Sequence, residues 1–310
     1  PSLRGKIYGI LQLAQPLGYL IGMILALIVA PMIGGWRSVF YLGGILPLAI
    51  AVLLVKALPE SVRFLAVRRR DPRKIKAILS RISTSLDAQP VDLTVPEGTA
   101  PGGMPVKDLF TEGRAAGTVL LWIPFFMNLL ILYFIVSWLP GLLQESSLAA
   151  SAGVMAVFFF SLGGMLGALA QGRLMNKFGI HPTLMAEFGV SVPLIAGLAF
   201  SSTSYAVLMG VVFVLGVTVQ GAQAGINALA AAFYPTRMRS TGVGWALGIG
   251  RIGSIVGPAL GGLLLTSQWT PRQILLAGMV PAACAATAVF LSDRIQAGRV
   301  AYRNEADIRG

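Results

Sequence analysis

Long apolar runs constrain this chain more than any other feature of its sequence. Eight runs each hold roughly 20 mostly apolar residues, the length that an α-helix needs to cross the hydrocarbon core of a bilayer. Strands of a membrane β-barrel would be about ten residues long with alternating polarity, and none of the runs has that pattern. The runs are residues 7–30, 39–58, 118–139, 152–171, 183–200, 205–233, 241–265 and 274–291. The sequence therefore predicts an all-α membrane protein.

Positive charge is distributed unevenly between the loops that these helices would join. If the segment before the first run is cytoplasmic, 21 of the 24 Lys and Arg residues fall on the cytoplasmic side. Arg37 and Arg272 fall on the other side, and Arg251 lies within a run. An excess of Lys and Arg marks the cytoplasmic side of a membrane protein. We therefore predict a multi-pass protein of the cell inner membrane with a cytoplasmic central loop and C-terminus, and its net charge of +12 requires no nucleic-acid partner.

The first two runs resemble the last two. A shift of 235 residues superposes six pairs of identical residues. These pairs are Arg4 and Arg239, Gly9 and Gly244, Gly18 and Gly253, Gly22 and Gly257, Arg37 and Arg272, and Gly43 and Gly278. Because both copies begin on the same side of the membrane, they form a parallel repeat, which is the relation between the two halves of a major facilitator transporter. The second copy has four further runs before the matched pair. We therefore expect four N-terminal spans to be absent and the runs to be spans five to twelve of twelve.

Several motifs are similar to those of known transporters. Residues 59–65 (PESVRFL) resemble the end of the first bundle in sugar porters and metabolite:proton symporters. The segments 34–40 (GGWRSVF), 227–229 (NAL), 233–236 (FYPT), 239–246 (RSTGVGWA) and 250–253 (GRIG) resemble the aromatic acid:proton symporter family of the major facilitator superfamily. This resemblance implies the major facilitator fold and uptake of benzoate-like or hydroxylated aromatic acids with a proton. The chain departs from the superfamily pattern at Asn176 and Lys177, where Asp and then Arg are usual.

Polar and aromatic side chains recur at helical spacing in several runs. Residues three or four apart share one face of a helix, and polar faces are costly in lipid, so we expect these faces to line a central solute path. The candidate substrate-binding residues are Gln12, Gln15, Trp122, Tyr133, Gln220, Gln223, Asn227 and Arg251. The alternative is that such groups only bind neighbouring helices. Gly253, Gly257 and Gly261, at four-residue spacing, instead predict a face for close helix contact.

Arg251 stands about ten residues into its run, near 15 Å from the cytoplasmic edge and close to the bilayer midplane. An uncompensated Arg there costs roughly 2.5–3.5 kcal/mol, so it must face protein or water and meet an anion. Its planar guanidinium can donate two parallel hydrogen bonds to a carboxylate. We therefore predict that Arg251 binds the substrate carboxylate. The alternative is an ion pair with an acid in the helices expected before this chain.

Five residues near the cytoplasmic ends of the runs are candidates for gating or proton coupling: Arg239, Asn176, Lys177, His181 and Glu187. His181 is the only histidine, and a histidine can gain or lose a proton near neutral pH. Glu187 is the only acid that we place within a run. The alternatives are that His181 helps to cap the helix end and that Glu187 pairs with a neighbour.

The predicted organisation has four parts. Residues 1–59 hold the last two spans of an N-terminal bundle, 60–115 a cytoplasmic loop and linker, 116–293 a six-helix C-terminal bundle, and 294–310 a cytoplasmic tail. We expect a monomeric, alternating-access symporter whose partners are the bilayer, an aromatic carboxylate and a proton. Two alternatives stay open: a carrier for another metabolite such as a sugar or an aliphatic organic acid, and a membrane receptor that keeps the carrier fold without transport. The sequence holds no nucleophile with a base, no metal-ligand cluster and no phosphate loop, so we predict neither an enzyme nor a cofactor or metal.

Overall fold

A computed structural model describes residues 17–18, 21–22, 24–25, 32, 35–57, 106–144, 152–200, 204–235 and 238–309. The chain divides into two compact units, one formed by Pro1–Met23 with Pro105–Gly310 and the other by Ile24–Met104. Every regular element in the described ranges is a helix. The predicted run 7–30, with candidate residues Gln12 and Gln15, lies mostly outside the described residues, and both glutamines are among those not described.

The smaller unit contributes one long helix, α4 (Trp36–Ala57). Gly35 precedes it with a φ of 79°, a conformation that a glycine adopts at little cost. The Ser38 hydroxyl donates to the Gly35 carbonyl oxygen at 2.7 Å in the first turn of the helix. Helix α4 covers residues 39–57 of the predicted run 39–58, and its described apolar part, Phe40–Val55, is shorter than the spans of the larger unit.

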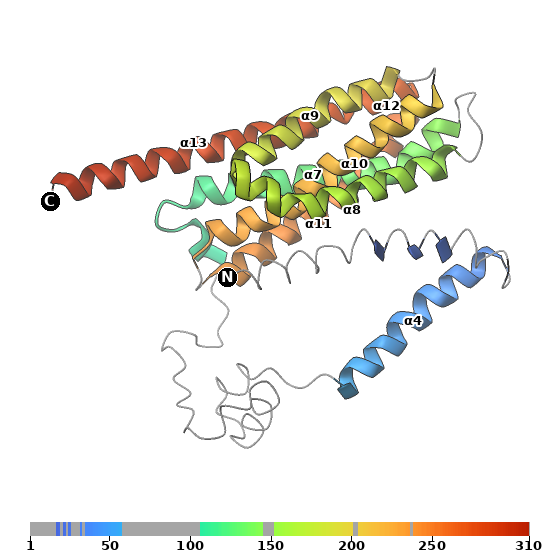
Figure 1. Ribbon diagram of the computed structural model, residues 1–310, viewed down its shortest axis with the longest axis horizontal. Helices are drawn as coiled ribbons and strands as arrows, with labels where there is room; N and C mark the ends of the chain where they lie inside the picture. The colour runs from blue at the N-terminus through green and yellow to red at the C-terminus, as the bar shows by residue number, and fades with distance from the viewer. Residues whose placement is uncertain are drawn as a thin grey trace. The chain divides into compact units, whose positions relative to one another are not determined.

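The larger unit is a bundle of long helices (Figure 1). After a short 3₁₀ helix, η3 (Val106–Phe110), it contains α7 (Ala115–Gln144), α8 (Ala152–Phe178), α9 (Ile180–Phe200), α10 (Tyr205–Phe233), α11 (Arg239–Thr266), α12 (Pro271–Ala277) and α13 (Met279–Arg309). Six helical segments of the described chain are long and apolar enough to cross a membrane, the last formed by α12 with the first part of α13 as Pro271–Ile295. These six correspond to the last six predicted runs.

The chain reverses direction at positions that the sequence marks. Gly179, with a φ of 91°, is the single residue between α8 and α9. Before α12, Thr270 and Gln273 form a capping box, and Pro271 occupies the first helical turn, where a missing N–H costs nothing. A glycine backbone conformation thus ends α8, and side-chain capping begins α12.

Glycine lets two pairs of helices approach to main-chain contact. A Cβ atom on Gly163 or Gly167 of α8 would collide with main-chain oxygens of α10. A Cβ on Gly253 of α11 would meet the Phe126 carbonyl oxygen of α7, and one on Gly257 would lie 2.6 Å from that of Leu130. A Cβ on Gly261 would collide with the Trp138 side chain of α7, so the predicted close-contact face of residues 253, 257 and 261 is confirmed.

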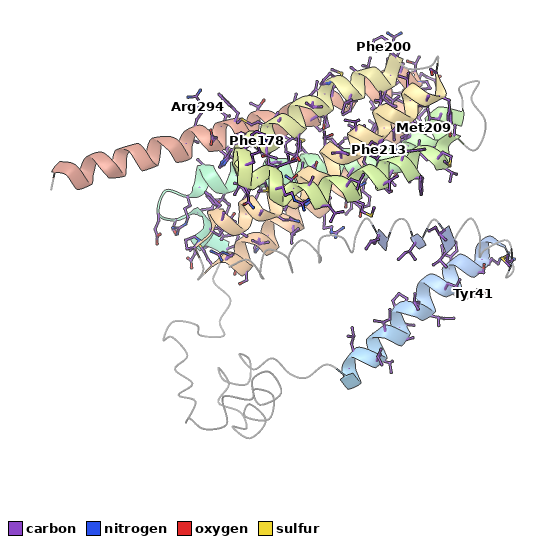
Figure 2. The ribbon with its side chains drawn as sticks, in the orientation of Figure 1. Tyr41, Phe178, Phe200, Met209, Phe213 and Arg294 are labelled. Atoms are coloured by element: carbon purple, nitrogen blue, oxygen red, sulfur yellow. The ribbon has the colours of Figure 1, made fainter. Side chains whose placement is uncertain are left out.

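The interior of the bundle is apolar, and cation–aromatic pairs lie at both ends of the bundle. Buried side chains such as Leu139, Phe160 and Leu215 belong to one continuous core. At one end of the bundle the Arg272 guanidinium lies 3.8 Å from the centre of the Phe200 ring. Phe178 and Arg294 mark the other end, beside Lys177 and Phe290 respectively (Figure 2). Basic and aromatic side chains at both ends of an apolar bundle are typical of the two membrane–water interfaces.

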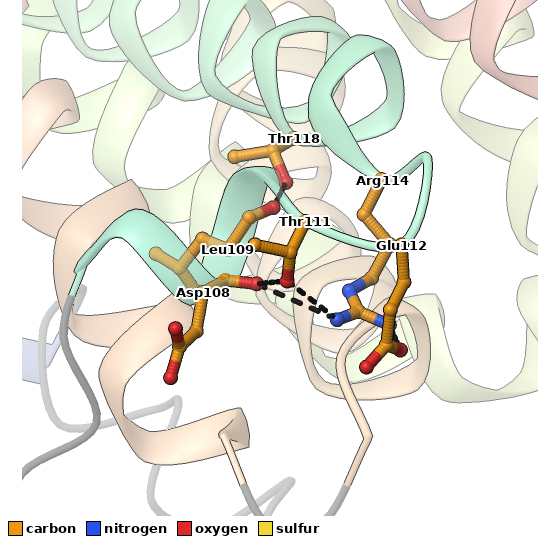
Figure 3. A network of polar contacts seen from close by, with 6 residues as sticks. All are labelled: Asp108, Leu109, Thr111, Glu112, Arg114 and Thr118. Atoms are coloured by element: carbon orange, nitrogen blue, oxygen red, sulfur yellow. Dashed lines mark hydrogen bonds and ion pairs between the residues drawn. The ribbon is translucent and has the colours of Figure 1, made fainter.

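The segment just before α7 is held against the bundle (Figure 3). Leu109 of η3 is fully buried, and its carbonyl oxygen accepts a hydrogen bond of 2.8 Å from the Thr118 hydroxyl of α7. Arg114 pairs with the Glu112 carboxylate and also donates to the Asp108 carbonyl oxygen at 3.4 Å. The end of the segment that we predicted as a linker is thus ordered on α7.

Candidate functional site

The side chain of Arg251 lies on an exposed face of α11. Its Nη1 donates to the hydroxyl of Tyr133 on α7 at 3.3 Å. Gly250 and Gly253, on either side of it in sequence, pack against the α7 main chain, which brings the guanidinium within reach of that helix. Within the described ranges, Arg251 forms no ion pair and Tyr133 Oη is its only hydrogen-bond acceptor. The guanidinium therefore has N–H groups available for an anion.

Two tryptophans stack beside the same α7–α11 contact. The rings of Trp122 on α7 and Trp245 on α11 are 6.2 Å apart and inclined by 19°. Phe110 of η3 meets Trp122 edge-on at 5.4 Å. Trp245 remains 45% exposed, so an apolar aromatic surface lies on the same two helices as the Arg251–Tyr133 pair. Indole rings of this kind pack well against another aromatic ring.

Three amide side chains connect α7 with α10. Asn128, fully buried in α7, donates through Nδ2 to the Gln223 Oε1 atom at 3.0 Å and to the Val219 carbonyl oxygen at 3.1 Å. Gln223 in turn donates to Asn227 Oδ1 at 3.4 Å. Of these residues only Asn227 is half-buried, so the connection leads from the bundle interior to a partly exposed amide.

Gln220 has a different environment from its neighbours on α10. Its Nε2 donates to the Phe160 carbonyl oxygen of α8 at 3.2 Å, and its amide fills the space left by Gly164. Gln220 and Gln223, which helical spacing puts on one face of α10, therefore bind two different neighbouring helices. Gln220 binds α8, whereas Gln223 binds Asn128 of α7 and donates to Asn227 on its own helix.

The candidates for gating and coupling lie at several places around α8, α9 and α11. Glu187 is buried and accepts a hydrogen bond of 3.2 Å from Gln171 of α8. The His181 Nδ1 atom lies 3.4 Å from the Asp293 carboxylate of α13. Exposed side chains occupy the remaining positions, Asn176 and Lys177 near the end of α8 and Arg239 at the start of α11. The Arg239 Nε donates to the Tyr234 carbonyl oxygen at 3.4 Å.

The sequence interpretation missed three residues that the structure places in these clusters: Asn128, Trp245 and Asp293. Asn128 carried a signal that was available, because an Asn within some 20 apolar residues is unusual in a span. Trp245 stood inside a motif that we noted only for its resemblance to other proteins. Asp293 lies just beyond the last predicted run, where an acid is ordinary, and only the fold brings it to His181.

Comparison with known proteins identifies the family. Residues 1–222 match the family model of the Major Facilitator Superfamily. The chain belongs to the major facilitator superfamily. It is an all-α, multi-pass membrane protein of that fold, as the sequence predicted.

Relatives with assigned names are transporters of aromatic acids. The chain is 38% identical over 258 residues to the 4-hydroxybenzoate transporter PcaK of Pseudomonas putida, an alignment that covers 83% of this chain and 58% of the relative. It is 37% identical to a gallate transporter of the same species, over 83% of this chain and 57% of the relative. It is 33% identical to the benzoate transport protein of Acinetobacter baylyi, over 88% of this chain and 59% of the relative. The chain thus spans less than two thirds of the length of these relatives, and its resemblance to aromatic acid transporters is confirmed.

Proposed function

We propose that this chain forms part of a proton-coupled symporter that takes up aromatic acids of the benzoate or hydroxybenzoate type by alternating access. The observation that carries the proposal is the exposed Arg251 guanidinium, bonded to Tyr133 and free of any carboxylate in the described part of the chain. The names of the relatives, which transport 4-hydroxybenzoate, gallate and benzoate, support the same class of substrate.

The chemistry of this pair suits a carboxylate. A guanidinium can donate two parallel hydrogen bonds to the two oxygens of a carboxylate, and the charge on both partners strengthens these bonds. Because Tyr133 Oη accepts one hydrogen bond from Arg251, its own O–H remains able to donate to the same anion. An anionic substrate would also supply the countercharge that an Arg within a membrane span requires.

An aromatic surface on the same two helices suits the ring of the substrate. Trp122 and Trp245 lie on the same two helices as Tyr133 and Arg251, with Trp245 partly exposed. We assign them the role of an aromatic surface that the substrate ring passes on its way to and from Arg251, because Trp122 stands eleven residues, about 16 Å of helix, before Tyr133. Sugars and aliphatic acids offer no such ring, so this assignment favours an aromatic acid over those alternatives.

Topology, coupling and assembly belong to the same proposal. We propose an inner-membrane protein, monomeric, with residues 116–293 as a six-helix C-terminal bundle and with the central loop and C-terminal tail in the cytoplasm. The charge asymmetry of the loops supports this orientation. His181, Glu187, Arg239, Asn176 and Lys177 remain candidates for gating or proton coupling.

Substitution of Arg251 tests the proposal. Arg251→Gln and Arg251→Lys are made in the protein expressed with whatever flanking sequence its gene encodes. Binding of 4-hydroxybenzoate and of its uncharged amide is then measured in purified protein. Loss of a charged hydrogen-bond pair costs about 1.5–3 kcal/mol, so Arg251→Gln is expected to weaken binding of the acid by roughly 10- to 100-fold and leave that of the amide nearly unchanged. Arg251→Lys keeps the charge and loses the planar fork, so its loss is smaller.

A matched control and a transport assay complete the test. Arg272→Gln removes an exposed arginine from the start of α12, where it lies over Phe200, and is expected to leave acid binding unchanged. Uptake of labelled 4-hydroxybenzoate by cells should collapse when a protonophore is added. Wild-type acid affinity in a correctly inserted Arg251→Gln protein refutes the site, and binding without accumulation favours a receptor instead of a carrier.

A further inference from the structure

The amides of Asn128, Gln223 and Asn227 form a chain of hydrogen bonds with one direction. Asn128 Nδ2 donates to Gln223 Oε1, and Gln223 Nε2 donates to Asn227 Oδ1. An amide has a donor end and an acceptor end, and the two look alike in shape. The direction of the chain therefore depends on whatever fixes its first member.

The main chain of α10 fixes that first member. Asn128 Nδ2 also lies 3.1 Å from the Val219 carbonyl oxygen, and a carbonyl oxygen only accepts hydrogen bonds. Turning the Asn128 amide over would place two acceptors against each other. The amide keeps its orientation even though its own Oδ1 is buried without a hydrogen-bond partner among the described residues, which is a costly arrangement. The Val219 carbonyl thus sets the direction of all three amides.

The consequence appears at Asn227, the last amide of the chain. Its Oδ1 is occupied by Gln223, and its Nδ2 donates to no residue in the described ranges. Asn227 is half-buried, whereas Asn128 and Gln223 are buried. The accessible end of this series of hydrogen-bonded amides therefore presents an N–H donor, not an acceptor.

The position of Asn227 complements that of Arg251. Helices α7 and α10 run in opposite directions, because Gly117 lies against Phe233 while Asn128 lies against Val219. Tyr133 is five residues beyond Asn128 on α7, about 7 Å along the axis, and Asn227 is four residues beyond Gln223 on α10, about 6 Å in the other direction. Side chains lean towards the N-terminus of their own helix, so Tyr133 and Asn227 lean towards the level of the Asn128–Gln223 bond from opposite sides, and Arg251 is hydrogen-bonded to Tyr133.

We propose that Asn227 is a donor subsite for a hydrogen-bond acceptor on the ring of the substrate, and that the buried Asn128 is the positioning residue that fixes its polarity. This inference rests on the proposed function, in which Arg251 holds the carboxylate at the other end of the same ligand. A ring substituent that accepts a hydrogen bond is then preferred to one that only donates. Asn128 acts on this preference without touching the ligand.

Substitution of Asn128 by Asp should reverse the preference. A protonated Asp side chain has one O–H, and the Val219 carbonyl can only accept, so the hydrogen goes to Val219. The same oxygen then accepts from Gln223, which turns its amide over and presents Oε1 to Asn227. Asn227 turns in its turn and presents Oδ1 to the ligand. One buried substitution thus converts the accessible end of the chain from donor to acceptor.

Pairs of benzoates that match in size measure this polarity. In the first pair, the ether oxygen of 4-methoxybenzoate only accepts hydrogen bonds, and 4-ethylbenzoate is its apolar counterpart. In the second pair, the amino group of 4-aminobenzoate mainly donates hydrogen bonds, and 4-methylbenzoate is its apolar counterpart. The same four substituents placed at ring position 3 test the case in which that position of the ring, and not position 4, faces Asn227. In the wild-type protein, expressed with its native flanking sequence, 4-methoxybenzoate should bind roughly 3- to 10-fold more tightly than 4-ethylbenzoate. 4-Aminobenzoate should bind no more tightly than 4-methylbenzoate. In the Asn128→Asp protein, 4-aminobenzoate should bind more tightly than 4-methylbenzoate by a similar factor. The tighter binding of 4-methoxybenzoate over 4-ethylbenzoate should disappear.

Two further variants keep the test decisive if Asn128→Asp does not fold. Asn227→Asp places an acceptor directly at the end of the chain and should show the same reversal, and Asn227→Leu should abolish both preferences. Unsubstituted benzoate separates the two proposals. If benzoate binds and depends on Arg251 but the methoxy and ethyl compounds bind equally to wild type, the donor subsite is wrong and the proposed function stands. If a folded Asn128→Asp protein keeps the wild-type preference, the positioning role is wrong; if none of these acids binds wild type, both proposals fail.

Discussion

A single methyl group added to Gly167 tests how tightly α8 and α10 are packed. The Cβ atom of an alanine at this position would collide with the main-chain oxygen of Val217 and lie 3.0 Å from its Cα. Neither neighbour is the end of a flexible side chain, so the two helices must separate to admit the methyl group. Overpacking of this kind costs about 1–3 kcal/mol, and each ångström of separation also forfeits dispersion contacts along the interface.

Gly172→Ala on the same helix is the matched control. No atom lies within 4 Å of a Cβ built on Gly172. In the interior of a helix alanine is favoured over glycine by about 0.5–1 kcal/mol, because glycine loses more freedom on folding. The same propensity gain acts at Gly167, so the two substitutions differ only in packing. We expect Gly167→Ala to be less stable than Gly172→Ala by about 1–3 kcal/mol.

Reversible unfolding in mixed micelles measures both variants under identical conditions. Two more pairs repeat the comparison on other helices, Gly216→Ala against Gly210→Ala on α10 and Gly253→Ala against Gly248→Ala on α11. In each pair the first glycine lies against a main-chain oxygen of the facing helix, and the second has nothing within 4 Å. Equal stability of Gly167→Ala and Gly172→Ala would show that α8 and α10 are not in main-chain contact.

Substitutions of Thr118 and of Glu187 test two further polar contacts. Thr118→Val removes the hydrogen bond to the buried Leu109 carbonyl, so it should destabilise the docked η3 segment by about 1–3 kcal/mol and speed proteolysis just before α7; Thr111→Val, at an exposed position, should not. Glu187→Gln keeps an acceptor for Gln171 and should unfold within about 1 kcal/mol of wild type, whereas Glu187→Leu leaves that buried amide without its acceptor and should lose about 1–3 kcal/mol. A Glu187→Leu protein as stable as wild type would show that the Gln171 contact contributes nothing.

Much of the fold follows from patterns that are local in the sequence. Runs of apolar residues locate the six spans of the larger unit, because a bilayer demands length and low polarity wherever the helix finally packs. Gly179 marks the end of α8, and the capping box of Thr270 and Gln273 marks the start of α12. The four-residue spacing of Gly253 and Gly257 marks a contact between helices. In each case the pattern itself lies within a few residues of the chain, so it can be recognised before the partner helix is known.

The site is less predictable, because it depends on which helix faces each side chain. Gln220 and Gln223 are three residues apart, and a periodicity argument places them on one stripe. The structure directs Gln220 to the α8 main chain and Gln223 to Asn128 of α7, because α10 lies between two helices and a stripe is wide enough to meet both. The pairing of His181 with Asp293 likewise joins residues more than a hundred positions apart, and neither residue type singles out the other.

The arrangement of acids explains why Arg251 is available to a ligand. An arginine within a membrane span requires an anion, and a carboxylate on a facing helix of the same bundle would satisfy it permanently. Glu187 and Asp293 are the acids within the described spans, and both are engaged elsewhere, Glu187 by Gln171 and Asp293 by His181. Arg251 instead contacts the neutral hydroxyl of Tyr133, which holds the guanidinium in place without cancelling its charge. In the proposed site, a group held in this way keeps its affinity for the carboxylate of a substrate.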